Sequence, residues 1–205
     1  MPGVDSATGS EARVSEWPGG HALDVATGTG DLALELARRV GPTGEVVGVD
    51  FAERMLELAR AKAASAQSAQ VRFEYADALA LPYDDDRFDA ATVGFGARNF
   101  SDLERGLGEM VRVVKPGGRV VVLEITTPTR PPLSTFLELW FDRIVPTLGR
   151  LAGDREAYSY LPSSVRRFPA PEALAAVMWE CGLRSVRYVI TAGGIIALHV
   201  GEVVR

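Results

Sequence analysis

The stretch His21–Val40 (HALDVATGTGDLALELARRV) constrains the fold of this chain more than any other. It begins as an apolar strand, tightens into a turn at Gly28 and Gly30, and continues as a helix with Asp31 in its first turn. Glycines without a Cβ atom let a ligand approach the backbone closely, and the start of a helix offers unpaired N–H groups. The stretch therefore predicts a turn that binds a nucleotide.

Two kinds of nucleotide fit this turn. Gly28-x-Gly30-x-x-Ala33 matches the fingerprint of dinucleotide-binding domains, and Asp50 follows at about the 20-residue spacing expected of an acid that binds a ribose. The same stretch matches the motif of S-adenosylmethionine methyltransferases, in which an acid in the strand, here Asp24, precedes the small residues. A carboxylate favours a positive sulfonium and disfavours a pyrophosphate. The sequence therefore favours a methyltransferase over an NAD-dependent oxidoreductase.

Composition and charge narrow the class of protein. The chain has 205 residues, 47% hydrophobic and 24% charged, as in a soluble globular domain. Its net charge is −5 and its basic residues form no long block, so no nucleic-acid partner is expected. One cysteine, Cys181, and two histidines predict neither a disulfide within the chain nor a metal site. No signal peptide or membrane-spanning apolar run is recognised, which predicts a cytoplasmic protein.

Strand and helix patterns alternate along the first two thirds of the chain. Residues 1–20, rich in small residues and proline, are predicted to be a disordered leader, which leaves 21–205 as a single domain. After the first strand, further strands are expected at Val46–Val49, Val71–Tyr75, Phe88–Phe95 and Arg119–Ile125. Helices are expected at Phe51–Lys62 and Leu103–Val114, the latter closed by Lys115-Pro116-Gly117-Gly118. This alternation predicts a parallel sheet that binds its ligand at the carboxyl ends of the strands.

The last third follows a different pattern. Pro171–Cys181 is typical of a helix, and Arg184–Ile190 with Ile195–Val203 predicts an antiparallel hairpin. Five parallel strands followed by such a hairpin are typical of class I S-adenosylmethionine-dependent methyltransferases, whose Rossmann-like α/β fold has a mostly parallel seven-stranded sheet. Between the two parts, Leu133–Leu151 carries a wide apolar stripe. Three interpretations of it stay open: core packing, a homodimer face, or a surface for an isoprenoid tail or a membrane.

Six longer segments add a more specific signal. They are DVATGTGDLALELA, GVDFAERMLELAR, ADALALPY, GFGARNFSDLERGLGEMVRVVKPGGRVVVLE, YSYLPSSVRRFP and GGIIALH. Together they resemble the UbiE/MenG family, the C-methyltransferases of menaquinone and ubiquinone biosynthesis, over about residues 21–201. The resemblance implies S-adenosylmethionine as the cofactor and a lipid-tailed, prenylated quinol as the substrate, demethylmenaquinol rather than a ubiquinone precursor. Such a substrate makes transient contact with a membrane surface plausible.

The resemblance also implies which residues bind the cofactor. Thr29 corresponds to the threonine of the glycine turn, Asp50 to the acid that holds both ribose hydroxyls, and Asp77-Ala78 to the pair beside the adenine. Gly94 stands where the family often has a serine. The predicted cofactor site is completed by residues of the glycine turn and its surroundings, namely Asp24, Gly28, Gly30 and Phe51. The alternative role for Asp50 is a cap of the helix that follows it.

The family's Arg-Asn pair at the reaction end of the site corresponds to Arg98-Asn99, and both residues are predicted to be catalytic. Arg98 is expected to stabilise a developing phenolate, or to position a water that takes the proton. A salt bridge to Asp102 or Glu104 is its structural alternative. His199 resembles a general base in its chemistry, but its position between apolar residues on a terminal strand favours a structural histidine.

Two further features of the resemblance stay open. Tyr158 and Tyr160 are predicted to line the quinone pocket, with a role in fixing their loop as the alternative. The family normally begins with helices that carry a Phe-Asp and a Tyr-Asp motif, and residues 1–20 contain neither. The alternatives to a prenylated-quinol enzyme are therefore a methyltransferase for another small molecule, and a domain that binds the cofactor without turnover.

Overall fold

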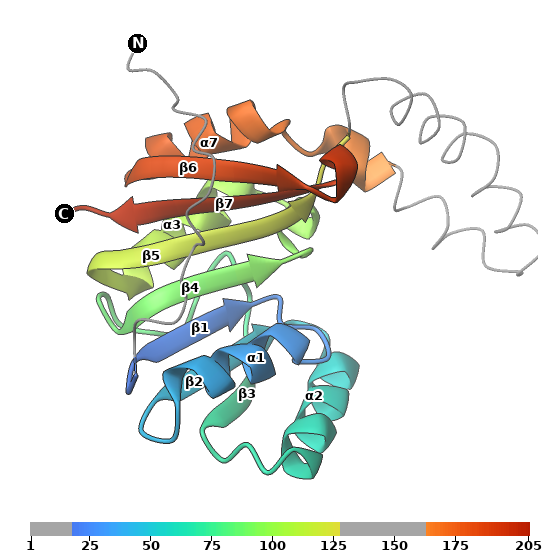
Figure 1. Ribbon diagram of the computed structural model, residues 1–205, viewed down its shortest axis with the longest axis vertical. Helices are drawn as coiled ribbons and strands as arrows, with labels where there is room; N and C mark the ends of the chain where they lie inside the picture. The colour runs from blue at the N-terminus through green and yellow to red at the C-terminus, as the bar shows by residue number, and fades with distance from the viewer. Residues whose placement is uncertain (1–17, 128–162) are drawn as a thin grey trace, which may run out of the picture.

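The computed structural model describes residues 18–127 and 163–205, and a sheet of seven strands forms its centre (Figure 1). In chain order the strands are β1 (His21–Val25), β2 (Glu45–Asp50), β3 (Val71–Tyr75), β4 (Phe88–Gly94), β5 (Val114–Ile125), β6 (Leu183–Thr191) and β7 (Ile196–Val203). They lie side by side in the order β3-β2-β1-β4-β5-β7-β6. The neighbouring pairs β3–β2, β2–β1, β1–β4 and β4–β5 are parallel. Strand β7 runs antiparallel to both β5 and β6.

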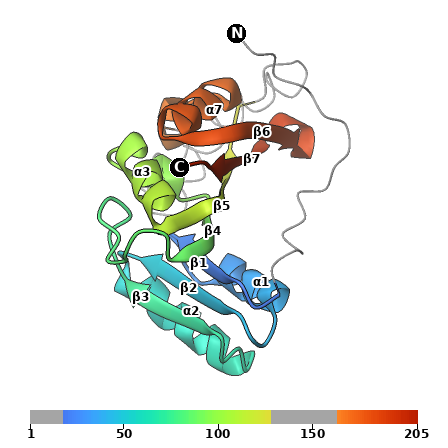
Figure 2. The same cartoon turned by 90° about the vertical axis from the view of Figure 1, so that its left-hand side faces the viewer.

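Helices pack on both faces of this sheet (Figure 2). They are α1 (Asp31–Val40), α2 (Glu53–Ser65), α3 (Leu103–Val113) and α7 (Pro171–Glu180), with single 3₁₀ turns at η2 (Ala97–Asn99) and η4 (Ala192–Gly194). The predicted α/β class, the seven-stranded sheet and the terminal hairpin are therefore confirmed. None of the helices in the two described ranges is long and apolar enough to cross a membrane.

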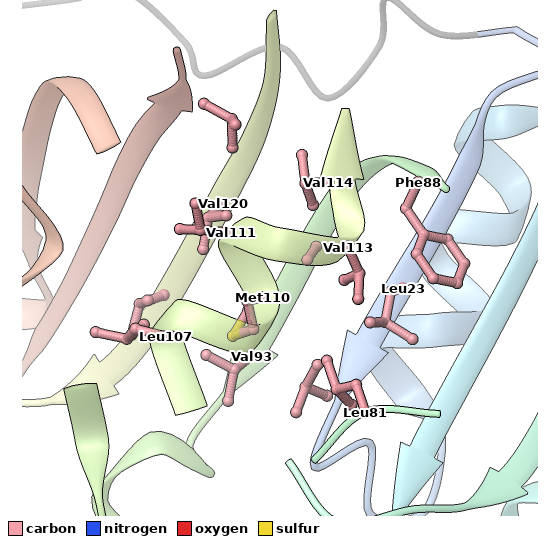
Figure 3. Packing of buried hydrophobic residues seen from close by; sticks show 14 of the residues in the cluster. Leu23, Leu81, Phe88, Val93, Leu107, Met110, Val111, Val113, Val114 and Val120 are labelled. Carbon is pink, nitrogen blue, oxygen red and sulfur yellow. The ribbon is translucent and has the colours of Figure 1, made fainter. Parts of the chain in front are cut away.

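Two separate apolar clusters correspond to the two faces. One contains the buried residues of α1 and α2 together with Phe73, and the other contains those of α3 and α7. Successive side chains of β1 point to opposite faces of the sheet: Ala22 belongs to the first cluster, whereas Leu23 and Val25 belong to the second. Figure 3 shows the second cluster, where Met110 of α3 lies over the sheet near Val93. Burial on both faces explains the continuous apolar strands of the sequence.

The structure corrects two predicted boundaries. Helix α2 begins at Glu53 rather than at Phe51, because the carboxylate of Asp50 accepts the N–H of Ala52 at 2.9 Å and holds the chain extended there. The segment Lys115–Gly118, expected to close the preceding helix as a breaker, instead belongs to β5, which begins at Val114. The register of β5 against β4 shifts between Phe88 and Ala90, and this irregularity accommodates the Pro-Gly-Gly sequence.

Two sequence features fall largely outside the described residues. The apolar stripe Leu133–Leu151 and residues 1–17 of the predicted leader belong to this part of the chain. The last leader residues do join the fold: the N–H of Gly19 donates to the carbonyl of Val40 at 2.8 Å, and the carbonyl of Gly20 accepts from Glu45 at 3.1 Å. Gly19 and Gly20 are therefore tied by their backbone to the ends of α1 and β2.

Candidate functional site

A cavity of about 650 Å³ opens where the carboxyl ends of β1, β2 and β4 meet. Its volume lies in the range of small-molecule and cofactor sites, and its place at the strand ends is the one expected for a ligand of this fold. The residues that line it come from five successive strand–loop segments: Val25–Gly28, Val49–Phe51 with Met55, Tyr75–Leu79, Gly94–Gly96, and Asn99–Ser101. Most of this lining is apolar, and the carboxylates of Asp50 and Asp77 are its charged groups.

The glycine turn contributes its first glycine to this cavity. Gly28 lines it in a left-handed conformation (φ +56°), and a Cβ atom there would meet no atom within 4 Å. Gly30 has a different function. Its φ is +82°, and a Cβ atom would stand 2.6 Å from Cζ of Phe73, so this glycine lets the turn pack on the sheet. Thr29 does not line the cavity. Its hydroxyl donates to the carboxylate of Asp31 and accepts a hydrogen bond from Nζ of Lys62.

Asp50 offers the best-defined binding group of the cavity. It is 8% exposed, and each of its carboxylate oxygens accepts one backbone N–H: Oδ2 that of Gly28 at 2.8 Å, and Oδ1 that of Ala52 at 2.9 Å. A carboxylate oxygen accepts about two hydrogen bonds, so each keeps one free position. Asp50 thus caps its own turn and can still accept two neighbouring hydroxyls, as a ribose presents them. The exposed Phe51 ring stands beside it at the cavity.

Asp24 does not line the cavity but lies behind the glycine turn. It is 1% exposed, and its oxygens accept the hydroxyls of Thr27 at 2.6 Å and Thr92 at 2.7 Å. Burial raises the pKa of this carboxyl to about 6. The structure therefore gives Asp24 a bracing role, in which it holds the strand end to β4, in place of the direct contact with the ligand that the sequence suggested.

The remaining predicted cofactor residues converge on the cavity. Asp77 and Ala78 follow β3, and the carboxylate of Asp77 accepts the N–H of Leu79 at 2.9 Å. Gly94 ends β4, and a Cβ atom there would stand 3.2 Å from Leu32. The loop that contains Asp77 thus forms the wall on the β3 side, and Gly94 forms the floor on the β4 side.

The predicted catalytic pair lies in η2, just after β4. Asn99 lines the cavity, and Arg98 is turned toward β5, where its Nη1 donates to Oε1 of Glu124 at 2.6 Å. Arg98 therefore does form a salt bridge, as its structural alternative supposed, but with Glu124 rather than with Asp102 or Glu104. Asp102 instead caps α3 by accepting the N–H of Arg105 at 2.9 Å. Glu124 was missed, and its only sequence signal was an acid within the apolar run VVVLEI.

A second cavity, of about 680 Å³, adjoins the first on the α3 side. The two cavities share three residues, Asn99, Phe100 and Ser101, which form the wall between them. Arg98 lines the second cavity only, together with the apolar side chains of Phe168 and Val177. Asn99 therefore lies at the junction of two spaces, one suited to a nucleoside and one open to another small molecule.

Other candidate residues lie away from this site. His199 is fully buried, its Nε2 donates to the carbonyl of Pro171 at 2.9 Å, and its ring stacks on Tyr188. Burial lowers the pKa of His199, which suits the structural interpretation. Tyr158 and Tyr160 lie outside the described residues. Within residues 18–127 and 163–205, no cluster of three or more His, Cys, Asp or Glu side chains is arranged to hold a metal ion.

Comparisons with known proteins agree with this geometry. The sequence profile described as the ubiE/COQ5 methyltransferase family matches residues 9–203. A demethylmenaquinone methyltransferase from Thermus thermophilus is 54% identical over 181 residues, which cover 88% of this chain and 81% of the relative. The ubiquinone/menaquinone biosynthesis C-methyltransferase UbiE from Geobacter sulfurreducens is 44% identical over 185 residues, which cover 90% of this chain and 72% of that protein.

Solved structures agree on the fold. The crystal structure of an S-adenosylmethionine-dependent methyltransferase from Aquifex aeolicus superposes with a TM-score of 0.66 at 20% identity, covering 93% of this chain and 86% of the other. At that identity the likeness concerns the fold alone, while the much closer sequence relatives define the family.

Proposed function

This chain belongs to the ubiE/COQ5 methyltransferase family, and from that premise we propose that it transfers a methyl group from S-adenosylmethionine to a ring carbon of a prenylated quinol. The proposed conversion is that of demethylmenaquinol to menaquinol. The observation that carries it is that Asn99 lies at the junction of two cavities: one has groups suited to a nucleoside, and the other is lined by Arg98.

The first cavity fits the cofactor in size and chemistry. Asp50 has a free acceptor position on each oxygen for the two ribose hydroxyls, worth roughly 1.5–3 kcal/mol per charge-assisted bond. Gly28 leaves open space where a Cβ atom would project. The apolar wall around Ala78 and Leu79, with Asp77 at its edge, suits an adenine ring. When bound, S-adenosylmethionine supplies a methyl group made electrophilic by the positive sulfur.

The second cavity supplies space for the ring that is methylated. Ionisation of a ring hydroxyl makes the neighbouring ring carbon nucleophilic, and a guanidinium favours the resulting negative charge. Arg98 lies in this cavity's lining, and Asn99 lies where the two spaces meet. Arg98, Asn99 and the other lining residues therefore have to hold the ring carbon in line with the methyl group and exclude water. Bringing the two reacting carbons together in this alignment provides much of the rate enhancement. The S–CH3 bond breaks as the new C–C bond forms, S-adenosylhomocysteine leaves, and the ring carbon loses its proton to a water molecule, which restores the aromatic ring.

The finer parts of the proposal follow from the substrate. We place the protein in the cytoplasm. Because a lipid-tailed quinol resides in a membrane, we also propose that the protein contacts the membrane surface transiently. A homodimer belongs to the proposal as well; the stripe Leu133–Leu151, whose three interpretations stay open, lies outside the described residues.

The test is methyl transfer by the purified protein. The chain is incubated with S-adenosylmethionine carrying a labelled methyl group and with a reduced demethylmenaquinone of short tail, and the quinone is analysed by mass spectrometry. We expect a labelled menaquinone and one equivalent of S-adenosylhomocysteine. Transfer to another small molecule but not to this quinol would favour the broader methyltransferase alternative. Cofactor binding without transfer to any quinol would contradict the proposal and favour a binding domain.

A further inference from the structure

One buried acid takes no part in the predicted site and yet contacts it. Glu124 lies near the end of β5 and is 1% exposed, on the face of the strand that also buries Val120 and Val122. An ionised carboxylate in an apolar surrounding is strongly unfavourable unless charged or polar groups compensate it. The groups that compensate Glu124 therefore show what the residue is for.

Three donors converge on this carboxylate. Oε1 accepts Nη1 of Arg98 at 2.6 Å and the N–H of Ile125 at 2.8 Å, while Oε2 accepts the backbone N–H of Arg98 at 3.2 Å. Two of the three donors belong to Arg98, one from its backbone and one from its side chain. Glu124 thus holds the backbone of η2 from a separate strand 26 residues away. Together with the carbonyl of Phe95, which also accepts Nη1 of Arg98 at 2.5 Å, it sets the direction of the Arg98 side chain.

The fixed turn leads directly into the wall between the two cavities. Asn99, which follows Arg98 directly, begins the three-residue segment that the cavities share. We propose that Glu124 is a positioning residue for methyl transfer: it holds the Ala97–Asn99 turn so that Arg98 and Asn99 face the reacting ring. This inference rests on the proposed function, because it assigns Glu124 to the same site.

A purely stabilising role explains the arrangement less well. Arg98 Nε is buried and has no hydrogen-bond partner among the described residues, and such a group lowers stability. A buried ion pair is in general no more stable than well-packed apolar side chains of the same volume. The buried Arg98–Glu124 pair, which leaves Nε of Arg98 without a partner among the described residues, is therefore better explained by the need to orient the Arg98 side chain at the cavity than by the stability of the fold.

The experiment compares two glutamates of matched contacts. Glu109 of α3 also accepts an arginine side chain, that of Arg112, together with a backbone N–H, that of Leu81, and it lines neither cavity. We expect Glu124→Gln to lower kcat about 100-fold, because a displaced group costs about that factor, with the Kd for S-adenosylhomocysteine changed less than about threefold. Glu109→Gln serves as the control for the loss of a carboxylate–arginine pair away from the cavities and is expected to keep its kcat. A kcat for Glu124→Gln that equals that of Glu109→Gln overturns the proposal.

A shorter acid and a double variant sharpen the result. Glu124→Asp keeps the charge but shortens its reach, so its kcat is expected between those of the wild type and Glu124→Gln; if Glu124→Gln does not fold, an unchanged kcat in Glu124→Asp overturns the proposal. Since Glu124 acts through Arg98, adding Glu124→Gln to Arg98→Ala should lower kcat by much less than about 100-fold. Additive losses would contradict an action through that side chain.

Amide hydrogen exchange separates this inference from the proposed function. We expect the backbone amides of residues 97–99 to exchange about tenfold or more faster in Glu124→Gln than in Glu109→Gln. If the wild-type protein methylates no quinol, the proposed function fails, and exchange still decides whether Glu124 holds the turn. Unchanged exchange at these amides would overturn the positioning role even in an active enzyme.

Discussion

Asp50 and Glu124, which lie on the two halves of the carboxyl edge, use their carboxylates in opposite ways. On the β1–β2 half, Asp50 accepts one backbone N–H on each oxygen and keeps a free acceptor position facing the cavity. On the β4–β5 half, Glu124 has three donors and lines neither cavity. The first carboxylate is arranged to bind a ligand and the second to hold another side chain. We therefore expect changes on the first half to alter cofactor affinity, and changes on the second to alter turnover.

The largest expected effect is on the β4–β5 half. Replacing Arg98 by alanine removes the charge beside the reacting ring, and loss of one such group costs about 100- to 1,000-fold in rate. The Kd for S-adenosylhomocysteine should stay within about threefold, since Arg98 does not line the cofactor cavity. Steady-state kinetics and calorimetry measure the two quantities on the same preparation. Normal turnover would remove Arg98 from the mechanism.

The two glycines of the turn sharpen the comparison within the β1–β2 half. Gly30→Ala combines a positive φ with a Cβ atom 2.6 Å from Phe73 and should lower the free energy of unfolding by about 3–4 kcal/mol. Gly28→Ala has the strained φ but free space, so about 1–2 kcal/mol is expected. Urea unfolding of both variants measures the difference. Equal losses would show that packing on Phe73 does not distinguish the two positions.

On the β1–β2 half, Asp24 makes the free energy of unfolding depend on pH. Its pKa is about 6 in the folded protein and about 3.9 when unfolded, so between these values the folded state binds more protons. The corresponding contribution to stability is present below about pH 4 and is lost as the pH rises through 6. Relative to Asp24→Asn, the wild type should thus lose about 2 kcal/mol of unfolding free energy from pH 4 to 7. Parallel pH profiles of the two proteins would contradict this account of Asp24.

The smallest expected effect, in free energy, concerns the ribose. Asp50→Ala should weaken binding of S-adenosylhomocysteine at least tenfold, or about 1.4 kcal/mol, by removing the acceptor of its hydroxyls. At saturating cofactor, kcat should change far less than in Arg98→Ala, because Asp50 lies on the other half of the edge. Calorimetric titration gives the Kd, and an unchanged value would exclude the ribose role. A loss of kcat as large as that of Arg98→Ala would break the division between the two halves.

The sequence predicted the β1–β2 half far better than the β4–β5 half. The glycine turn and Asp50 are local signals, since strand, turn and acid follow one another along the chain and the sheet order brings them together. The pattern could not separate Gly28, at the cavity, from Gly30, against Phe73, because that difference depends on a contact with another strand.

On the other half, the partners offered for Arg98 as the alternative to a catalytic role were its sequence neighbours, whereas its observed partner, Glu124, comes from β5. Side-chain pairs between strands depend on the direction in which each residue of a turn points, and spacing along the chain does not contain that information. The same reason explains Asp24: its position before the glycines suggested contact with a ligand, but the strand's alternation turns it toward Thr27 and Thr92.

The most direct test of this division is a crystal structure with S-adenosylhomocysteine bound. The account predicts both ribose hydroxyls on the Asp50 carboxylate, the adenine beside Asp77 and Ala78, and the sulfur directed toward Asn99, with the Arg98–Glu124 pair intact. A ligand that leaves Asp50 without a ribose contact, or that binds in the cavity lined by Arg98, would contradict it.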